Sequence, residues 1–145
     1  MIVRSDRFEE LDAATLYGLL RLRCDVFVVE QHCAYPELDG RDVEPDTVHV
    51  WLEHDGAPAA YLRVLAEPGG GARIGRVCTA KAHRGAGLAS RLLSAALDEI
   101  GPDRRCVLDA QTDAIRIYER FGFTPIGPTY VEDGIEHLPM CRVYG

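Results

Sequence analysis

The hydrophobic positions of this chain change their spacing along the sequence, and each spacing predicts a kind of element. From Ala13 to about Val26, apolar side chains recur three and four residues apart, which is typical of one helix face. Asp12 precedes this segment and can cap it, because its carboxylate can accept hydrogen bonds from free N–H groups of the first turn. Residues 2–5 fit a short strand before the helix, and the apolar run 26–29 leaves a second short helix open.

The middle of the chain reads as an antiparallel meander of three strands. Val48–Glu53 and Ala59–Leu65 flank Asp55-Gly56, a pair of residues typical of a hairpin turn. Three glycines at 69–71 make a second reversal, and Arg73–Thr79 follows as the third strand. These segments predict a sheet built largely from neighbouring strands.

The second half alternates helices and strands. The clearest amphipathic helix runs from Leu88 to Ile100 and stops at Gly101-Pro102. The remaining elements are predicted as a strand at Cys106–Ala110, a helix from Gln111 or Thr112 to Phe121, and a last hairpin of Phe123–Ile126 with His137–Val143 around Asp133-Gly134. The order β-α-(α)-β-β-β-α-β-α-β-β indicates one α/β (α+β) domain over residues 1–145, with a mixed, mostly antiparallel sheet flanked by helices.

Composition and charge narrow the class of protein. The chain has 145 residues, with 16 Lys+Arg against 23 Asp+Glu and a net charge of −7. No apolar run reaches the ~18–20 residues of a membrane span, and the N-terminus lacks a secretory signal. No basic stripe suggests nucleic acid. We therefore expect a soluble cytoplasmic protein that binds neither membrane nor nucleic acid, and the sequence leaves a homodimer open.

The five cysteines are widely spaced and form no Cys-x-x-Cys pair, and the five histidines are scattered singly. This pattern predicts no metal site and a reduced compartment. Residues 33–47 form a polar stretch with five acids and one base. They are either a solvated connector or a lid that faces a substrate.

One turn carries candidate chemistry: Arg84-Gly85-Ala86-Gly87-Leu88-Ala89, between a strand and the strongest helix. A helix N-terminus has unpaired N–H groups and a partial positive charge, and glycines let a phosphate approach them. Arg84 adds a cation, so an acidic protein can bind a pyrophosphate locally. The turn is neither a Walker A motif nor a dinucleotide fingerprint. The alternative is a tight turn that uses glycine for steric reasons alone.

Arg-x-x-Gly-x-Ala after a strand resembles the acetyl-CoA pyrophosphate motif of the GCN5-related N-acetyltransferase (GNAT) superfamily. A second signature of that family is present from Gln111 through Ala114 and Tyr118 to Gly122-Phe123, with Gln at a position where Asn is common. The segments 22–31, 39–42 and 130–140, together with His49, resemble the ElaA-type subgroup. The stretch Arg-x-x-Val-Phe-x-x-Glu also resembles acyl-homoserine-lactone synthases, although this chain is short for those enzymes.

The resemblance implies acetyl-CoA as co-substrate and no metal. It assigns cofactor binding to the strand edge and the turn, with these residues: Val77, Cys78, Thr79, Arg84, Gly85, Ala86, Gly87, Leu88, Ala89, Gln111 and Tyr118. A backbone N–H near Val77 or Cys78 would bind the thioester oxygen. Tyr118 matches the family's general acid, although packing on a helical face is its alternative role. Cys78 as an acyl-enzyme nucleophile is the less favoured reading, because a small core residue explains it.

The base that removes a proton from the acceptor amine is left open among Glu30, His49 and His137, which lie in or beside segments expected to border the substrate. The leading hypothesis is an N-acetyltransferase that acts by direct attack of a small, cationic amine on the thioester. The alternatives are transfer of a longer acyl chain, or a non-catalytic acyl-CoA sensor.

Overall fold

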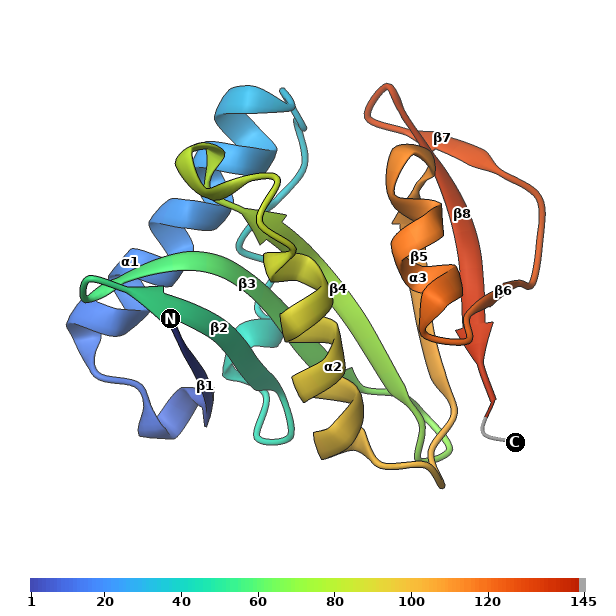
Figure 1. Cartoon of the computed structure of the whole chain (residues 1–145), viewed down its shortest axis with the longest axis horizontal. Coiled ribbons are helices and arrows are strands. Elements are labelled where there is room, and N and C mark those ends of the chain that lie inside the picture. The colour runs from blue at the N-terminus through green and yellow to red at the C-terminus, as the bar shows by residue number, and fades with distance from the viewer. Residues whose placement is uncertain (144–145) are drawn as a thin grey trace.

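Residues 1–143, the part of the chain that the computed structural model describes, fold around one eight-stranded sheet (Figure 1). Its strand order is β1-β2-β3-β4-β5-β8-β6, with β7 paired to β8. Within this range only β4 and β5 pair in parallel. The strands are β1 Ile2–Arg7, β2 Val48–His54, β3 Ala57–Ala66, β4 Ala72–Thr79, β5 Cys106–Gln111, β6 Thr124–Pro125, β7 Tyr130–Glu132 and β8 Ile135–Arg142. The expected fold class is confirmed.

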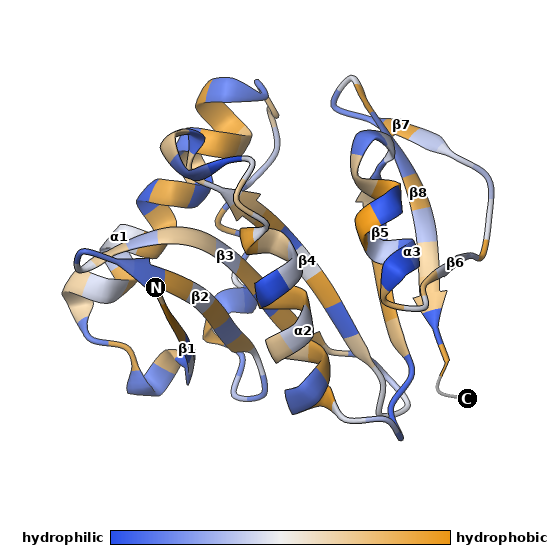
Figure 2. Cartoon of the chain, in the orientation of Figure 1, coloured by the Kyte–Doolittle hydropathy of each residue, from blue (hydrophilic) through white to orange (hydrophobic). Residues whose placement is uncertain are grey.

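Helices cover both faces of the sheet and create two cores. The helices are α1 Ala13–Arg23, α2 Leu88–Ile100 and α3 Ile115–Arg120, with short turns η1 Phe8–Glu10, η3 Arg41–Val43, η4 Lys81–His83 and η5 Thr112–Ala114 and the π-helical η2 Cys24–Glu30. α2 and α3 pack on one face in the larger core, and α1 with η2 packs on the other. Figure 2 shows hydrophilic residues on the outward sides of α2 and α3. None of the described helices is long and apolar enough to cross a membrane.

The first helix follows its predicted start but not its predicted end. Asp12 caps α1 by accepting a hydrogen bond of 2.7 Å from the Thr15 N–H. The α-helix stops at Arg23, and the chain continues through seven residues with wider π-helical turns rather than ending near Val26. π-Helical turns are rare and often mark functional segments. Here the extension carries Glu30 toward the turn before α2, as described below.

The last hairpin differs from its expected pairing. The strand that precedes Asp133-Gly134 is β7, whose Tyr130 lies opposite His137 of β8. β6 pairs instead with the far end of β8, where Thr124 lies opposite Cys141. The expected direct hairpin of Phe123–Ile126 with His137–Val143 is therefore wrong about the turn. β8 is long enough to serve two short strands in succession.

The central feature of the sheet is the early separation of β4 and β5. They pair only through Ala72–Cys106 and Arg73–Val107. On its other side β4 shifts register against β3, and Arg76 takes a positive φ of 54° inside the strand. One extra residue on a strand is a β-bulge, which bends the strand and increases its twist. β4 therefore curves away from β5, and Figure 1 shows the two halves of the sheet diverging.

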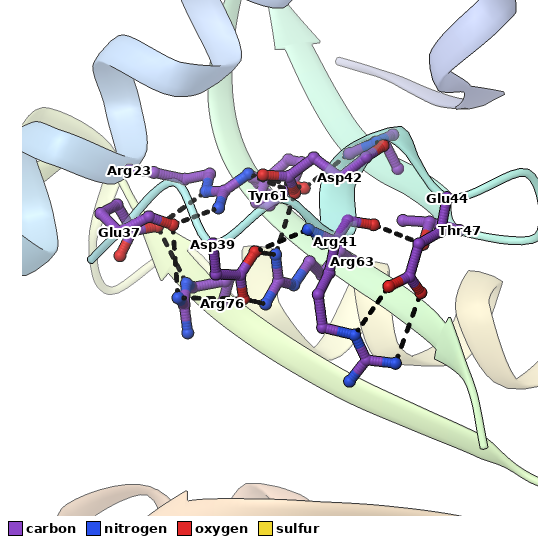
Figure 3. A network of polar contacts seen from close by, with 11 residues as sticks. Arg23, Glu37, Asp39, Arg41, Asp42, Glu44, Thr47, Tyr61, Arg63 and Arg76 are labelled. Atoms are coloured by element: carbon purple, nitrogen blue, oxygen red, sulfur yellow. Dashed lines mark hydrogen bonds and ion pairs between the residues drawn. The ribbon is translucent and has the colours of Figure 1, made fainter. Parts of the chain in front are cut away.

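A buried polar network holds the segment 33–47 against the back of this bend (Figure 3). Arg23 of α1 binds Glu37 and Asp42, each at 2.8 Å. Arg63 of β3 binds Asp39 at 2.6 Å and Asp42 at 3.0 Å. Neighbouring arginines hold the pKa of Asp39 and Asp42 below the usual range, although burial opposes this. The positive charges of Arg23, Arg63 and Arg76 thus balance the negative charges of Glu37, Asp39 and Asp42.

This network corrects the interpretation of residues 33–47 as a solvated connector. Glu37 is 5% exposed and Asp42 is 7% exposed, so the loop is part of the packed structure. Arg76, the bulged residue of β4, donates from Nε to the Glu37 carboxylate at 2.9 Å. Its guanidinium also lies 5.0 Å from the centre of the Tyr35 ring. The loop therefore anchors the bulge that opens the sheet.

We predict that Arg23→Met destabilises the fold strongly, because it removes one of the two arginines that bind each of the buried carboxylates Glu37 and Asp42. Breaking a buried pair from one side costs about 3–5 kcal/mol. The matched control is Arg4→Met, since Arg4 forms the partly exposed pair with Glu53 at 3.1 Å, and surface pairs contribute less than about 1 kcal/mol. Urea unfolding of both variants measures the difference. Equal losses would contradict the structural role given to the network.

Candidate active site

Between β4 and β5 the sheet opens into a cleft of about 600 Å³. Its walls come from both halves of the chain, because the strands separate after Arg73 and leave β4 without a partner on that side. An unpaired strand edge presents N–H and C=O groups to whatever lies beside it. The cleft therefore offers a row of backbone donors and acceptors to an extended ligand.

Residues on both faces of the sheet line the cleft. Leu108 and Ala110 of β5 point into the core under α2 and α3. Because side chains alternate along a strand, Asp109 and Gln111 point to the opposite face. Elements on each face contribute to the cleft wall. On the α3 side these are Ala114, Ile117 and Tyr118, and on the opposite face they are Tyr130, Glu132 and His137 of β7 and β8. Two ligands can thus meet in the gap from opposite faces.

The turn before α2 forms one end of the cleft and fits a phosphate group. Gly85 and Gly87 have φ values of +85° and +73°, which disfavour any side chain. A Cβ built at either position meets no atom within 4 Å, so the space outside the backbone is open. Gly87 caps α2 without a side-chain hydrogen bond, which leaves first-turn N–H groups for an external acceptor. The residues predicted to hold the pyrophosphate of CoA therefore fit it.

Arg84 in this turn is paired with Glu30 at the end of η2. Its Nη1 and Nη2 donate to the two carboxylate oxygens at 2.8 and 3.0 Å, and its Nε donates to the Thr79 carbonyl. The hydrogen bonds from Arg84 lower the pKa of Glu30. A carboxylate held in this way is a poor base. Glu30 lines the cleft as expected, but its geometry suits it to orient Arg84 rather than to accept a proton.

Tyr118 lies in the cleft wall on α3, with its ring against Phe123 in the core. The ring packs in the core, as its alternative role expects, and the side chain also lines the cleft, while its role as general acid stays a prediction. Burial, and secondarily the Asp113 charge, raises the pKa of Tyr118 to about 12. The hydroxyl therefore keeps its proton across the physiological range and can act as a donor.

The strand edge predicted to bind the cofactor is also in the cleft. Val77, Cys78 and Thr79 line it, directly after the bulge at Arg76. Burial raises the pKa of the Cys78 thiol to about 12, and the side chain packs in the core beneath α1. A thiol that stays protonated is a weak nucleophile. The structure therefore favours the core role for Cys78 and direct transfer over an acyl-enzyme.

Gln111 ends β5 and spans the opening. Its Nε2 donates to the Gln31 side chain at 3.0 Å, which links the C-terminal half of the sheet to the residue that follows η2. Both glutamines line the cleft. The amide expected to contact the cofactor at this position donates to Gln31 in this structure, and its contact with the cofactor stays a prediction.

His49 is not part of the cleft, which corrects its candidacy as a base. The side chain is 1% exposed, and both ring nitrogens have partners in the buried network. Nε2 lies 3.0 Å from the Asp42 carbonyl, so it must donate, and Nδ1 then accepts from the Tyr61 hydroxyl at 2.7 Å. Burial lowers the pKa of His49 and keeps the ring neutral. Its function is structural.

His137 does line the cleft, on the face opposite α3, together with residues that sequence reasoning did not assign. Tyr130 stacks on the His137 ring with centroids 5.5 Å apart and planes at 20°. Glu132 ends β7 and Asp133 begins the β7–β8 turn, and these two adjacent acids both line the cleft. The Asp133-Gly134 turn signal could have revealed this group, because it sets Tyr130 opposite His137 in register. Of the remaining predicted cofactor residues, Gly85, Ala86 and Gly87 form the turn at its end, Leu88 begins α2 with its side chain in the core, and Ala89 lines the wall.

Comparison with known proteins agrees with this geometry. A family model described as an acetyltransferase (GNAT) domain matches residues 17–143. The chain is 50% identical over 138 residues to UPF0039 protein Rv2851c of Mycobacterium tuberculosis, covering 92% of this chain and 88% of that one. It is 40% identical over 141 residues to protein ElaA of Escherichia coli, covering 92% and 90%.

A solved structure with the same fold comes from Pseudomonas aeruginosa and is named an acyl-CoA N-acyltransferase. It matches with a TM-score of 0.91 and 38% identity over 99% of this chain and 100% of that one. Because the family model spans most of the sequence, this chain belongs to the GNAT family of acyl-CoA N-acyltransferases. The resemblance first seen in the turn and in the second signature is thereby confirmed.

We predict that Arg84→Gln weakens CoA binding about tenfold, or about 1.4 kcal/mol, because one cation is lost beside the phosphate turn. The affinity for pantetheine, which lacks the diphosphate, should hardly change. Arg91→Gln is the matched control, since Arg91 lies on α2, the helix that follows this turn, and its Nη2 reaches the Met1 carbonyl at 3.4 Å. Calorimetry with both ligands makes the comparison, and an equal loss for CoA and pantetheine would contradict the assignment.

Proposed function

We propose that this protein transfers an acetyl group from acetyl-CoA to a primary amine of a small cationic acceptor. The observation that carries the proposal is the cleft itself, which has a phosphate turn at one end, an unpaired strand edge along it and a protonated tyrosine in its wall. The GNAT family assignment supplies the class of reaction. Acetyl-CoA rather than a longer acyl-CoA, and the cationic acceptor, are inferences beyond that class.

The reaction requires a balanced exchange of bonds and protons. The amine nitrogen attacks the thioester carbon, the C–S bond breaks, and the nitrogen loses one proton as the amide forms. The departing sulfur takes a proton from the Tyr118 hydroxyl, which later regains one through solvent. The unpaired edge of β4 offers N–H groups to the developing oxyanion. CoA supplies the thioester, and the protein orients it and keeps the proton donor in place.

Negative charge in the cleft wall on the face opposite α3 supports a cationic acceptor. Within residues 1–143 Glu132 and Asp133 take part in no ion pair, whereas the Arg73 guanidinium in the same wall is paired with Glu67 and Asp109. The acids of residues 33–47, which first suggested a cationic substrate, are largely neutralised by buried arginines. The argument for a cation therefore moves from that loop to the β7–β8 turn.

We predict that Tyr118→Phe folds and binds acetyl-CoA as the unaltered protein does but loses turnover by about 10²–10⁴-fold, the usual contribution of a positioned proton donor. Tyr17→Phe is the control, because Tyr17 is 72% exposed on α1. Free thiol release with a mixture of amines measures the rate. Turnover that is unchanged at neutral and at alkaline pH would exclude the role of Tyr118.

We predict that polyamines and lysine-like amines are acetylated faster than neutral or acidic amines, and that added salt slows them, because exposed charges are screened within about 10 Å at 0.1 M salt. Glu132→Gln with Asp133→Asn should reduce the preference for cations. Initial rates over a panel of amines and salt concentrations test this. Indifference to both acceptor charge and salt would contradict the cationic acceptor.

The two other functions are separated by the same measurements. A faster reaction with hexanoyl-CoA than with acetyl-CoA would identify a longer-chain acyltransferase. Thermal stabilisation by acetyl-CoA without thiol release in the presence of any amine would indicate a sensor. No stabilisation by any CoA species would contradict all three functions.

A further inference from the structure

Among the three residues considered as bases, His137 alone combines a place in the cleft wall with a free ring nitrogen. Its Nδ1 lies 2.9 Å from the Ile135 carbonyl oxygen. A carbonyl can only accept a hydrogen bond, so Nδ1 carries the proton and donates it. In the neutral ring Nε2 must then hold a lone pair. Within residues 1–143 that nitrogen has no hydrogen-bond partner.

The ring is fixed on two sides. The Ile135 carbonyl sets its tautomer and rotation, and the Tyr130 ring stacks against its face. A partner on one histidine nitrogen commonly decides what the other nitrogen can do. In the pairing of β8 with β5, His137 lies opposite Gln111, which is the last residue of β5 and lines the cleft. The imidazole is therefore presented from a paired strand rather than from a mobile loop.

The position of His137 complements that of Tyr118. Tyr118 belongs to the core under α2 and α3, whereas His137 shares the opposite face with Gln111 and Tyr130. Both line the same cleft. A proton donor for the sulfur and a proton acceptor for the amine would thus flank the gap from the two faces, which matches the approach of two ligands from opposite sides.

We propose that Nε2 of His137 is the general base that takes the proton from the acceptor amine, with the Ile135 carbonyl and the Tyr130 ring as its positioning groups. This inference rests on the proposed acyltransfer. The acceptor ammonium first gives one proton to Nε2. The neutral amine nitrogen then forms its bond to the thioester carbon, the C–S bond breaks, the sulfur takes the proton of Tyr118, and the nitrogen loses its second proton to solvent as the amide forms. The imidazolium then returns its proton through solvent, and the tyrosine is restored in the same way.

Other charged groups share this part of the cleft and contribute to any pH dependence. They are Asp109 of β5, Tyr130 and Glu132 of β7, Asp133 of the turn, and Arg73 and Arg76 of β4 across the cleft. Asp109 and Arg73 pair with each other at 2.7 Å, and Arg76 pairs with Glu37 at 2.9 Å. Glu132 and Asp133 would favour an ammonium group beside His137 and thereby a substrate that arrives protonated.

The test uses His137→Asn, because the asparagine amide can keep the hydrogen bond to the Ile135 carbonyl while Nε2 is removed. His54→Asn is the control, since His54 is an exposed residue that does not line the cleft. The probes are acetyl-CoA with ethylamine, which is protonated at neutral pH, and with trifluoroethylamine, which is largely neutral there. Thiol release is followed from acidic to alkaline pH.

We expect His137→Asn to reduce kcat/KM for ethylamine about 100-fold or more. We expect kcat/KM for trifluoroethylamine to change only several-fold. The dependence of kcat/KM for ethylamine on pH toward the acidic side should also differ from that of the unaltered protein. Equal losses for the two amines, or an unaltered acidic limb, would overturn the role of His137 while leaving acyl transfer in place. Absence of thiol release by the unaltered protein would instead overturn the proposed function, and the role of His137 with it.

Discussion

Backbone pairing between β4 and β5 ends after Arg73, and both the cleft and its unpaired strand edge follow from that separation. The bend arises at Arg76, where one extra residue forces a positive φ on a side chain that ordinarily avoids it. The strained position persists because its side chain is bound by Glu37 and rests over Tyr35. The opening of the sheet is therefore maintained by contacts behind it.

Those contacts belong to a buried ionic network, which is an expensive way to build a core. Burying charges costs free energy that only good geometry and complete hydrogen bonding recover. Here Arg23, Arg63 and Arg76 meet Glu37, Asp39 and Asp42 from four parts of the chain, so the network fixes one arrangement of α1, the 33–47 segment, β3 and β4. Apolar packing alone would define their relative positions less sharply, because it is not directional.

Charge also has separate roles in different regions of this acidic protein. The net charge of −7 does not prevent phosphate binding at the start of α2, since backbone N–H groups and Arg84 act locally. Glu30 holds Arg84 at that end of the cleft. The acids of the β7–β8 turn lie in the wall near His137 and stay unpaired within the described residues, so they are the ones that can influence a second substrate.

The sequence by itself determined the local features, because capping, amphipathic spacing and turn chemistry depend on neighbouring residues. Asp12 as a cap, the buried face of α2, the glycine turn and Tyr118 in the second signature could all be read in this way. It could not show that Glu37 and Asp42 are buried against arginines far away in the chain, or that His49 lies inside that network while His137 faces the cleft. Each of those outcomes depends on long-range pairing and on the register of β8, which only the tertiary structure decides.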